Sequence, residues 1–442
     1  HSLEPAFRSL PIMETAGVPI QFSSDMKHTG GSGADTLHRM IKWFIHRKLL
    51  PPSPIITTSH PVDGDQRVGI HAMALYTPDR VVHQADMEKR DGCVGKYTSG
   101  LGQQEIGFCD ADEDAVSMAL TAVERLMLGA NIPWSAIGRV EVGTESMVDR
   151  SKSIKTFLMR LFQEHGVEDI CGVDNYNACY GGTAALLNSV DWVGSESSRG
   201  KMAIVVCVDI ADLDTHQAFL NGASCVAMLV GRQAPLIVEP GRGHHFMDTT
   251  DFYKPVGRRD PYPVMLDGKY SIDCYMTSLE KCYERLSQGD SKLFQTVDYQ
   301  VYHCTATYLC RRAFQLLAAK TSPALTLQQK QALYAQKVEP STRATARIGS
   351  SYTASVYTNL YSLLFHKRPG NSERILMYSY GSGSAATMYT LRAERPVQLV
   401  TNLTVILDKR RRYEADDYVA TIQRYSGMYG ATNQRCDVDT QE

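Results

Sequence analysis

Cys179 is the residue whose setting most strongly suggests chemistry. It stands in DNYNACYGGTAALLNSVDWV, between an extended segment and a glycine pair that opens an apolar helix. A thiol at a helix N-terminus faces unpaired N–H groups and the positive end of the helix dipole, which stabilise its thiolate. Gly181 and Gly182 would let a thioester approach the backbone, where N–H groups could hold an oxyanion. The pattern predicts a nucleophilic cysteine; the alternative is a buried structural cysteine.

Two other reactive side chains stand where predicted strands end. Glu145 follows the apolar strand of RVEVGTE and precedes a basic helix, SKSIKTFLMRLF. Partial removal from water favours the protonated form of a carboxyl group and suits it to proton transfer. His303, in VDYQVYHCTATYLC, falls where a strand gives way to a helix, so its imidazole could donate to a carbonyl oxygen. Taken one at a time, a solvated loop glutamate and a structural histidine are the alternatives.

The elements that must position these residues alternate between strands and helices. Short β-branched runs and helical periods follow one another from Arg67 onward, which is the pattern of an α/β layered fold. In DEDAVSMALTAVERLMLG, apolar residues at helical spacing follow acidic residues, and Gly129 closes the predicted surface helix. Two successive β/α series of similar size predict two halves that share one core. Strands are expected at VGIHAMALY, RVEVGTE, KMAIVVCVDIA, CVAMLVG, VDYQVYH, RILMYSYG and AATMYTLRAE, and helices at about 151–164, 181–193, 271–286 and 305–319.

Composition narrows the class of protein. The formal net charge is only −2 over 442 residues, so no global field steers the chain toward nucleic acid or an anionic membrane. No apolar run is long enough for a transmembrane helix. The 11 cysteines are scattered without a CxxC pair, which predicts reduced thiols in a cytoplasmic setting and neither a disulfide framework nor a metal site.

The chain divides into four predicted segments. The first is rich in Ser, Pro, Gly and Thr and contains one possible amphipathic helix, TLHRMIKWFIHRKLL, for which packing on its own domain is favoured over a membrane or partner surface. The last is polar and contains DKRRRYEADD, whose basic run is expected to be a solvated face, with phosphate or partner binding as the alternative. The segments are an N-terminal extension (1–66), a first half (67–238), a second half (239–400) and a C-terminal tail (401–442).

Taken together, the sequence resembles the 3-hydroxy-3-methylglutaryl-CoA (HMG-CoA) synthase family of the thiolase superfamily, from about Arg67 to Arg392. The resemblance implies a thiolase-like five-layer α-β-α-β-α fold built from two similar halves, usually in a homodimer. The matching stretches are DGCVGKYTSGLGQQEIGFC, GRVEVGTESMVDRSKSIKT, NACYGGTAALLNSVDWV, DFYKP, LDGKYSIDCY, SYTASVYTNLYSLL and YSYGSGSAATMY, in the family's order and at near-family spacing.

The resemblance implies a role for each of the three residues. The family's NACYGG cysteine, here Cys179, takes an acetyl group from acetyl-CoA. The second Glu of EVGTE, here Glu145, acts as general acid and base and removes a methyl proton from the acetyl thioester. The family's histidine at the strand-to-helix junction, here His303, anchors acetoacetyl-CoA. Water then releases the condensed product from the cysteine.

Further positions match substrate-binding parts of the family. These are Asp209 in VCVDIA, Asp251 and Tyr253 in DFYKP, and the turn Gly381-Ser382-Gly383, which in the family lies against the reacting acyl groups. For the glycines, a tight turn is a sufficient structural reason.

Three departures from the family fall around the expected pocket. Leu213 replaces a usual Tyr in a rewritten loop, and Ser350 stands where an Asn usually contacts the acetoacetyl group. Tyr308 takes the place of a Lys associated with CoA, which removes a point charge from a phosphate site. The nucleophile, the base and the anchor are unchanged, so we expect the same condensation chemistry in an altered pocket.

The expected function is therefore an acyltransferase of the HMG-CoA synthase type, with acyl-CoA and acetoacetyl-CoA as substrates and no separate cofactor. One alternative is a relative in specialised metabolism that uses another acyl donor or a carrier-protein thioester, as the departures suggest. Another is a non-catalytic scaffold, against which the intact Cys179, Glu145 and His303 argue.

Overall fold

The computed structural model describes residues 67–211, 213, 215–252, 268–290 and 292–428, all within one compact unit that spans residues 48–442. The amphipathic helix predicted near the N-terminus and Tyr253 lie outside the described residues. Within the described part of the chain, no helix is long and apolar enough to cross a membrane.

Ten strands of the described chain form one sheet, and three more form a small one. The predicted strands are all present. The large sheet contains β1 (Val68–Tyr76), β4 (Ile137–Gly143), β5 (Asp174–Asn175), β6 (Met202–Ile210), β7 (Ala223–Arg232), β8 (Leu236–Phe246), β9 (Tyr299–Tyr302), β10 (Glu373–Gly381), β11 (Ala385–Ala393) and β12 (Gln398–Leu399). The small sheet contains β2 (Arg80–His83), β3 (Glu105–Phe108) and β13 (Arg411–Tyr413).

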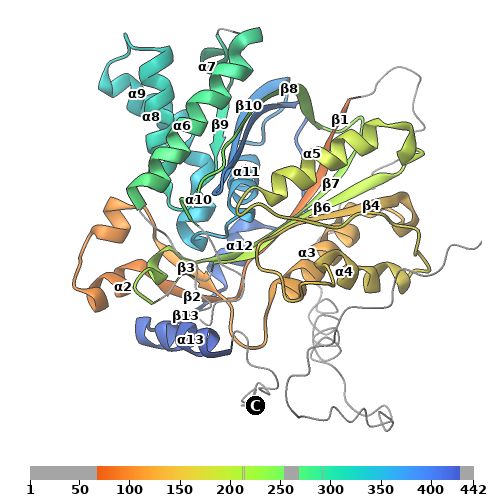
Figure 1. Cartoon of the computed structure of the whole chain (residues 1–442), viewed down its shortest axis with the longest axis horizontal. Helices are drawn as coiled ribbons and strands as arrows, with labels where there is room; N and C mark the ends of the chain where they lie inside the picture. Colours follow the sequence, from red (N-terminus) through yellow and green to blue (C-terminus); the bar gives the residue numbers. More distant parts are fainter. Residues whose placement is uncertain (1–66, 212, 214, 253–267, 291, 429–442) are drawn as a thin grey trace, which may run out of the picture. The chain divides into compact units, whose positions relative to one another are not determined.

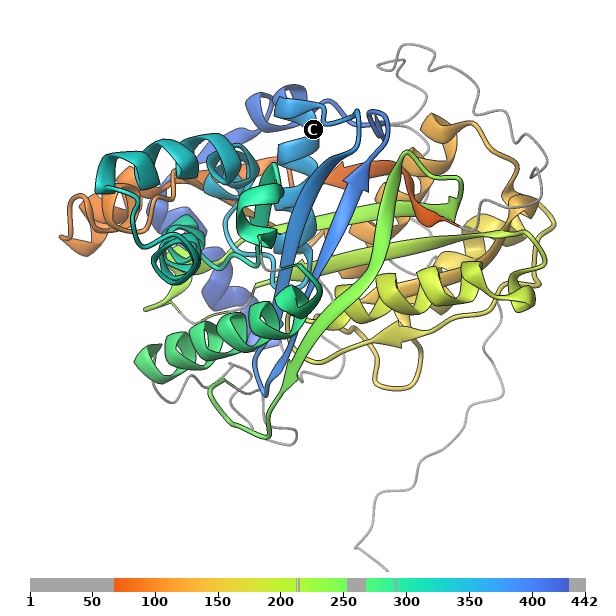
Figure 2. The ribbon, with the colours of Figure 1, turned by 90° about the horizontal axis from the view of Figure 1, so that it is seen from above.

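The strand order repeats between the two halves. The first half runs β4-β6-β7-β1 and the second runs β9-β10-β11-β8. In each half the first pair is parallel and the next two pairs are antiparallel. The halves join where β1 pairs with β8, through Gly69 with Ile237 and Ile70 with Leu236. Figure 2 shows β8 in green beside the blue strand β11, which in turn lies beside β10. The prediction of two similar halves is confirmed.

Helices lie on both sides of these strands and between them (Figure 1). α3 contacts β1, β6 and β7, whereas α5 contacts β4, β6 and β7. The helices are α2 (Gln84–Asp91), α3 (Ala115–Ala130), α4 (Ile154–Gln163), α5 (Gly181–Gly194), α6 (Gly268–Leu286), α7 (Leu293–Thr296), α8 (Thr307–Thr321), α9 (Leu327–Lys337), α10 (Glu339–Ile348), α11 (Ala354–Lys367), α12 (Leu403–Asp408) and α13 (Ala415–Met428).

Alternation along β10 shows the order of the layers. Successive side chains of a strand point to opposite faces of its sheet. Ile375 and Met377 pack in one core with residues of α5 and α11, whereas Leu376 and Tyr378 pack in another core with residues of α6 and α8. The second-half strands are therefore covered by α5 and α11 on one face and by α6 and α8 on the other. With α3 against the first-half strands, this is the expected α-β-α-β-α arrangement.

The predicted helix at DEDAVSMALTAVERLMLG ends later than expected. Asp114 caps its start by accepting from the Ser117 N–H (2.7 Å), which satisfies one of the first free donors of the helix. Gly129 lies inside α3, and a Cβ there would come within 2.5 Å of Val400. The helix ends at Ala130, and its C-cap Asn131 lies in the left-handed region with φ 52°. The glycine thus permits close packing and does not end the helix.

The basic run of the C-terminal tail, Lys409 to Arg412, is exposed except at Arg410. Arg410 is buried and bonds Glu105 and the carbonyl of Arg347. Arg411 and Arg412 pair with acids next to β2, namely Asp79 (3.0 Å) and Asp86 (2.5 Å). Because β13 also pairs with β2, the run ties the tail to the first half. The expectation of a solvated face is therefore confirmed for Lys409, Arg411 and Arg412 and wrong for Arg410 alone.

Candidate active site

Cys179 sits on a tight turn before α5. Ala178, the residue before it, lies in the left-handed region with φ 44°, and α5 begins at Gly181. The thiol is half-buried, whereas nearby Cys207 and Cys225 are fully buried, and burial raises the pKa of both well above the usual range. N–H groups and the helix dipole at the start of α5 favour negative charge on Sγ. Among these three thiols, Cys179 alone is both accessible and in a setting that favours the thiolate.

Glu145, which follows β4, lies beside the Cys179 thiol. Its carboxylate oxygen Oε1 lies 3.5 Å from Cys179 Sγ, so the thiol can donate to it. β4 ends at Gly143, two residues before Glu145, and runs parallel to β6. The predicted nucleophile and the predicted base, 34 residues apart in sequence, are therefore neighbours in the fold.

Close contact between β4 and α5 sets this distance. A Cβ on Gly143 would come within 2.2 Å of the Gly182 Cα and N atoms, and a Cβ on Gly182 would come within 2.5 Å of Cys207 Sγ. Two of these obstacles are backbone atoms, which cannot rotate away. Glycine at both positions lets the helix that follows Cys179 touch the strand that leads to Glu145.

Gly143→Ala is therefore expected to separate the two residues. The added methyl must displace the first turn of α5, so we expect a loss of about 1–3 kcal/mol in stability. Turnover should fall by about 10²-fold, since an ångström of misplacement between reacting groups can have that effect. Thermal unfolding and steady-state kinetics check this. Unchanged turnover would contradict the close approach. Gly194→Ala is the matched control, because Gly194 has no positive φ and an added Cβ there would come no closer than 3.9 Å to another residue.

Asp209 holds the loop that carries Glu145. It is fully buried, and its Oδ1 accepts from Thr144 Oγ1 (3.0 Å), Glu145 N (2.8 Å), and Ser146 N (3.0 Å) and Oγ (2.8 Å). Its Oδ2 accepts from the N–H of Thr353 (3.0 Å). Burial, and then the charge of Glu145, raise the pKa of Asp209. These contacts make Asp209 a support for the loop of Glu145, and the substrate contact suggested by the sequence stays a prediction.

Asp251 supports the turn that faces Cys179. It is fully buried and accepts from Gly383 N (3.0 Å) and the Tyr380 hydroxyl (2.9 Å). The turn itself lies against the cysteine loop. A Cβ on Gly381 would come within 2.4 Å of Asn177 O, and Asn177 Nδ2 donates to Ser382 O (3.1 Å). The predicted Gly381-Ser382-Gly383 turn and Cys179 are thus brought together.

His303 follows β9 at the end of the sheet where β10 leads to that turn. Its backbone N–H donates to the backbone carbonyl of Tyr378 (2.7 Å). The imidazole is buried, and within the described chain Nδ1 has no hydrogen-bond partner. Burial lowers the pKa of His303 to about 4, so the ring is neutral near pH 7. Ser350, just before α11, is likewise buried with a hydroxyl that lacks a partner among the described residues.

The neutral state of His303 leads to a pH prediction. An unfolded histidine takes up a proton below its ordinary pKa of 6.5, whereas folded His303 does so only near 4. Lowering the pH from 7 to 5 should therefore remove roughly 2 kcal/mol of stability through this residue. The thermal midpoint of the wild type should drop more over this range than that of His303→Gln. Equal drops would mean that the imidazole is not held neutral.

The departures from the family have different surroundings. Leu213 is buried, and its backbone bonds the side chain of Asn221 at 3.0 Å in both directions. Tyr308 lies in the first turn of α8, and its hydroxyl accepts from Arg312 Nη1 (2.9 Å). Neither bonds Cys179 or Glu145 in the described contacts.

Several supporting residues were missed by the sequence analysis. Thr144 and Ser146 flank the base, Asn177 bonds the opposite turn, and Thr353 bonds both Asp209 and Gly182. The small hydroxyl residues of GTES and of the segment before α11 were the available signal. Nothing in their spacing indicated which backbone groups they would meet.

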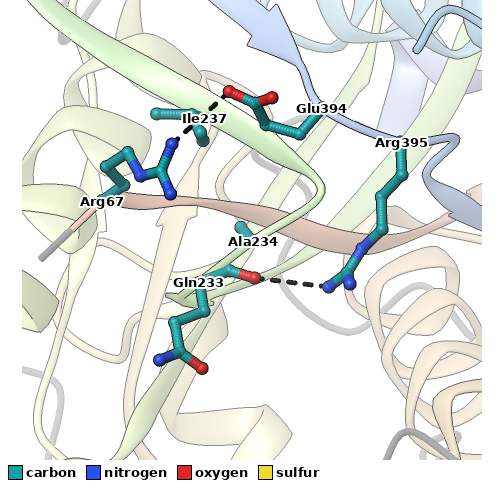
Figure 3. A pocket seen from close by; sticks show the side chains of 6 residues that line it. All are labelled: Arg67, Gln233, Ala234, Ile237, Glu394 and Arg395. Carbon is teal, nitrogen blue, oxygen red and sulfur yellow. Dashed lines mark hydrogen bonds and ion pairs between the residues drawn. The ribbon is translucent and has the colours of Figure 1, made fainter. Parts of the chain in front are cut away.

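A pocket elsewhere on the unit is lined by Arg67, Gln233, Ala234, Ile237, Glu394 and Arg395 (Figure 3). Arg67 pairs with Glu394 (3.5 Å), and Arg395 Nη2 donates to Gln233 O (3.4 Å). These residues lie where β7 ends and β1 begins, and β7 is antiparallel to β6. The pocket is thus at the opposite end of the strands from Glu145 and Asp209.

Comparison with known families gives matches over the described unit. The family descriptions "Hydroxymethylglutaryl-coenzyme A synthase N terminal" and "C terminal" match residues 64–235 and residues 236–322 and 313–442. The mitochondrial hydroxymethylglutaryl-CoA synthase of Mus musculus is 36% identical over 87% of this chain and 86% of its own length. The synthase erg13A of Aspergillus fumigatus is 40% identical over 74% of this chain and 80% of its own length.

Solved structures agree with these matches. MvaS in complex with 3-hydroxy-3-methylglutaryl coenzyme A superposes with a TM-score of 0.73 at 33% identity, over 81% of this chain and 92% of that one. PksG of Bacillus subtilis, an HMG-CoA synthase, shares the fold with a TM-score of 0.76 at 21% identity, over 85% of this chain and 93% of that one. The chain belongs to the hydroxymethylglutaryl-CoA synthase family, as the motifs around Cys179 predicted.

Proposed function

We propose that this condensing enzyme carries an acetyl group on Cys179 and joins it to acetoacetyl-CoA, releasing HMG-CoA. The observation that carries the proposal is the 3.5 Å contact between Cys179 Sγ and Glu145 Oε1 at the start of α5. A nucleophile and a proton acceptor within reach of each other are what two-step acyl transfer requires.

In the first step, Cys179 Sγ attacks the thioester carbonyl of acetyl-CoA. The new S–C bond forms as the bond to the CoA sulfur breaks, and the thiol proton, accepted by Glu145, ends on the departing CoA thiol. The positive end of the α5 helix dipole is suited to stabilise the transient oxyanion. The N–H groups of its first turn already have partners, since Tyr180 donates to Asn177 O (3.0 Å) and Gly182 donates to Thr353 Oγ1 (2.6 Å).

In the second step, Glu145 removes a proton from the methyl group of acetyl-Cys179. The resulting carbanion attacks the ketone carbon of acetoacetyl-CoA, and the alkoxide takes up the proton that Glu145 removed. Water then cleaves the thioester to Cys179 and leaves a carboxylate on HMG-CoA. Neutral His303 can donate one hydrogen bond to the acceptor's oxygen without a full charge nearby. The steps balance without a metal or a separate cofactor.

A second candidate is the same chemistry with a different acyl donor, acceptor or carrier. It is supported by Ser350, which is shorter than the family's Asn and keeps a buried hydroxyl without a partner in the described chain. Leu213, which replaces the family's Tyr, and Tyr308 also support this candidate. Tyr308 has a hydroxyl bonded to Arg312 where the family has a lysine. A smaller side chain at Ser350 leaves more room beside the acceptor, which favours a bulkier acceptor.

Assembly and compartment remain proposals as well. A homodimer is the expected state on the family resemblance, and light scattering of the purified chain tests it. A cytoplasmic location is the prediction from the scattered cysteines. The relatives include both the mitochondrial synthase of Mus musculus and a cytoplasmic one of Gallus gallus, so the family does not decide the compartment.

The test of the proposed function is a product assay. The wild type is incubated with acetoacetyl-CoA and, in parallel, with acetyl-, propionyl- and butyryl-CoA, and products are identified by liquid chromatography with mass spectrometry. HMG-CoA formed from acetyl-CoA supports the first candidate. Products only from a longer donor support the second. If no acyl-CoA gives a product, the first candidate is contradicted, and the second then requires product from an acyl carrier-protein thioester in the same assay.

A further inference from the structure

Thr353 stands at the position in the second half that Cys179 occupies in the first. α5 precedes β6 and α11 precedes β10, and these two strands correspond in the repeated order. Each helix follows a non-glycine residue in the left-handed region, Ala178 (φ 44°) before Cys179 and Tyr352 (φ 40°) before Thr353. The two turns thus have the same backbone form, but one carries a thiol and the other a hydroxyl.

The hydroxyl of Thr353 does not cap its own helix. A threonine at the N-cap usually accepts from an N–H group in the first turn of the helix that it starts. Thr353 is the N-cap of α11 and makes no such bond. Instead its Oγ1 accepts from the N–H of Gly182, in the first turn of α5, at 2.6 Å. The N-cap side chain of α11 therefore accepts a hydrogen bond from the first turn of α5. The donor, Gly182, is three residues after Cys179.

The backbone of Thr353 bonds the support of the base. Its N–H donates to Asp209 Oδ2 (3.0 Å), and Oδ1 of the same carboxylate accepts from the N–H of Glu145 (2.8 Å). Thr353 and Asp209 are fully buried. One residue thus connects the helix of the nucleophile to the loop of the base, through two hydrogen bonds shielded from water, where such bonds are strongest.

We propose that Thr353 is a positioning residue for the condensation, which holds Cys179 and Glu145 in register through Gly182 and Asp209. The inference rests on the proposed function, because it concerns the two residues to which that function assigns the chemistry. Thr353 itself touches neither reacting group in the described contacts. Its hydroxyl fixes the start of α5, and its N–H fixes the carboxylate that holds the loop of Glu145.

Thr353→Val removes the hydroxyl, keeps the shape and leaves the N–H bond to Asp209 in place. We expect turnover to fall about 10- to 100-fold, because the nucleophile and base lose their fixed separation. The KM for acyl-CoA should stay within about threefold, since the substrate contacts are untouched. Thr353→Ser restores the hydroxyl and should return turnover to within about threefold of the wild type.

Thr183→Val is the matched control. Thr183 Oγ1 bonds the Tyr357 hydroxyl at 2.8 Å, so it also links α5 to α11 and is also fully buried. It has no bond to Asp209 or to the loop of Glu145 in the described chain. Both valine variants should lower the thermal midpoint by similar amounts, but only Thr353→Val should lower turnover more than about threefold.

The experiment measures acylation of Cys179 by intact-protein mass, turnover and thermal midpoint for the wild type and these three variants. A turnover loss confined to Thr353→Val supports the inference. Equal losses in the two valine variants, or wild-type turnover in Thr353→Val, would overturn it while leaving the proposed function intact. A wild type that no acyl-CoA acylates would instead overturn the proposed function, and this inference with it.

Discussion

Cys179→Ala is expected to abolish the covalent acyl adduct and to reduce turnover by at least about 10⁴-fold, the scale of loss when a nucleophile is removed. Sγ is the atom that forms the thioester, and neither Cys207 nor Cys225 can replace it, because burial raises their pKa and shields them. The thermal midpoint should change little, since the thiol is half-buried at a helix start. Intact-protein mass and steady-state kinetics check both parts.

Cys171→Ala is the control for this variant. Cys171 is an exposed free thiol, so it reports acyl groups picked up by any accessible cysteine. Its replacement should leave the adduct and turnover unchanged. If the adduct survived Cys179→Ala and disappeared in Cys171→Ala, Cys171 would carry the acyl group and our assignment to Cys179 would be wrong.

Glu145→Gln is expected to separate the two steps. The amide keeps the size of the side chain and leaves the backbone N–H bond to Asp209 in place. Cys179 loses its proton acceptor and should be acylated more slowly, but the helix start still favours the thiolate, so the acyl adduct should still form. Condensation should fall by about 10²–10⁴-fold, because the carboxylate beside Cys179 Sγ that would remove the methyl proton is lost. The acyl-enzyme should accumulate, and mass measurements over time would show it.

Glu168→Gln is the matched control for the second variant, because it makes the same substitution at an exposed glutamate outside the site. It should condense at the wild-type rate. If Glu145→Gln also condensed at that rate, the role of Glu145 as base would be wrong, whatever its distance from the thiol.

The sequence predicted those parts of the site that depend on local structure. A strand end, a glycine pair and a helix start define where Cys179, Glu145 and His303 stand, and periodicity is enough to find such points. The alternation of strands and helices also predicted the layers. The helix end at Ala130 was missed because the glycine before it allows close packing against Val400, a contact remote in sequence.

The supports of the site could not be predicted in the same way. Asp209 bonds Thr353 across 144 positions and Gly182 bonds Thr353 across 171, and both contacts exist only because two halves fold around shared central helices. Likewise, the sequence places Arg410 in a solvated basic run, whereas in the fold Arg410 pairs with Glu105. Local patterns cannot indicate such partners, since burial decides which polar groups must find each other.

The most direct test of the account is a two-step mass measurement on the wild type. The protein is incubated briefly with acetyl-CoA, the excess is removed, and acetoacetyl-CoA is added. We expect a mass increase of one acetyl group, located by peptide analysis at Cys179, which disappears as HMG-CoA forms in equal amount. An adduct on another residue, or one on Cys179 that acetoacetyl-CoA does not discharge, would contradict the account.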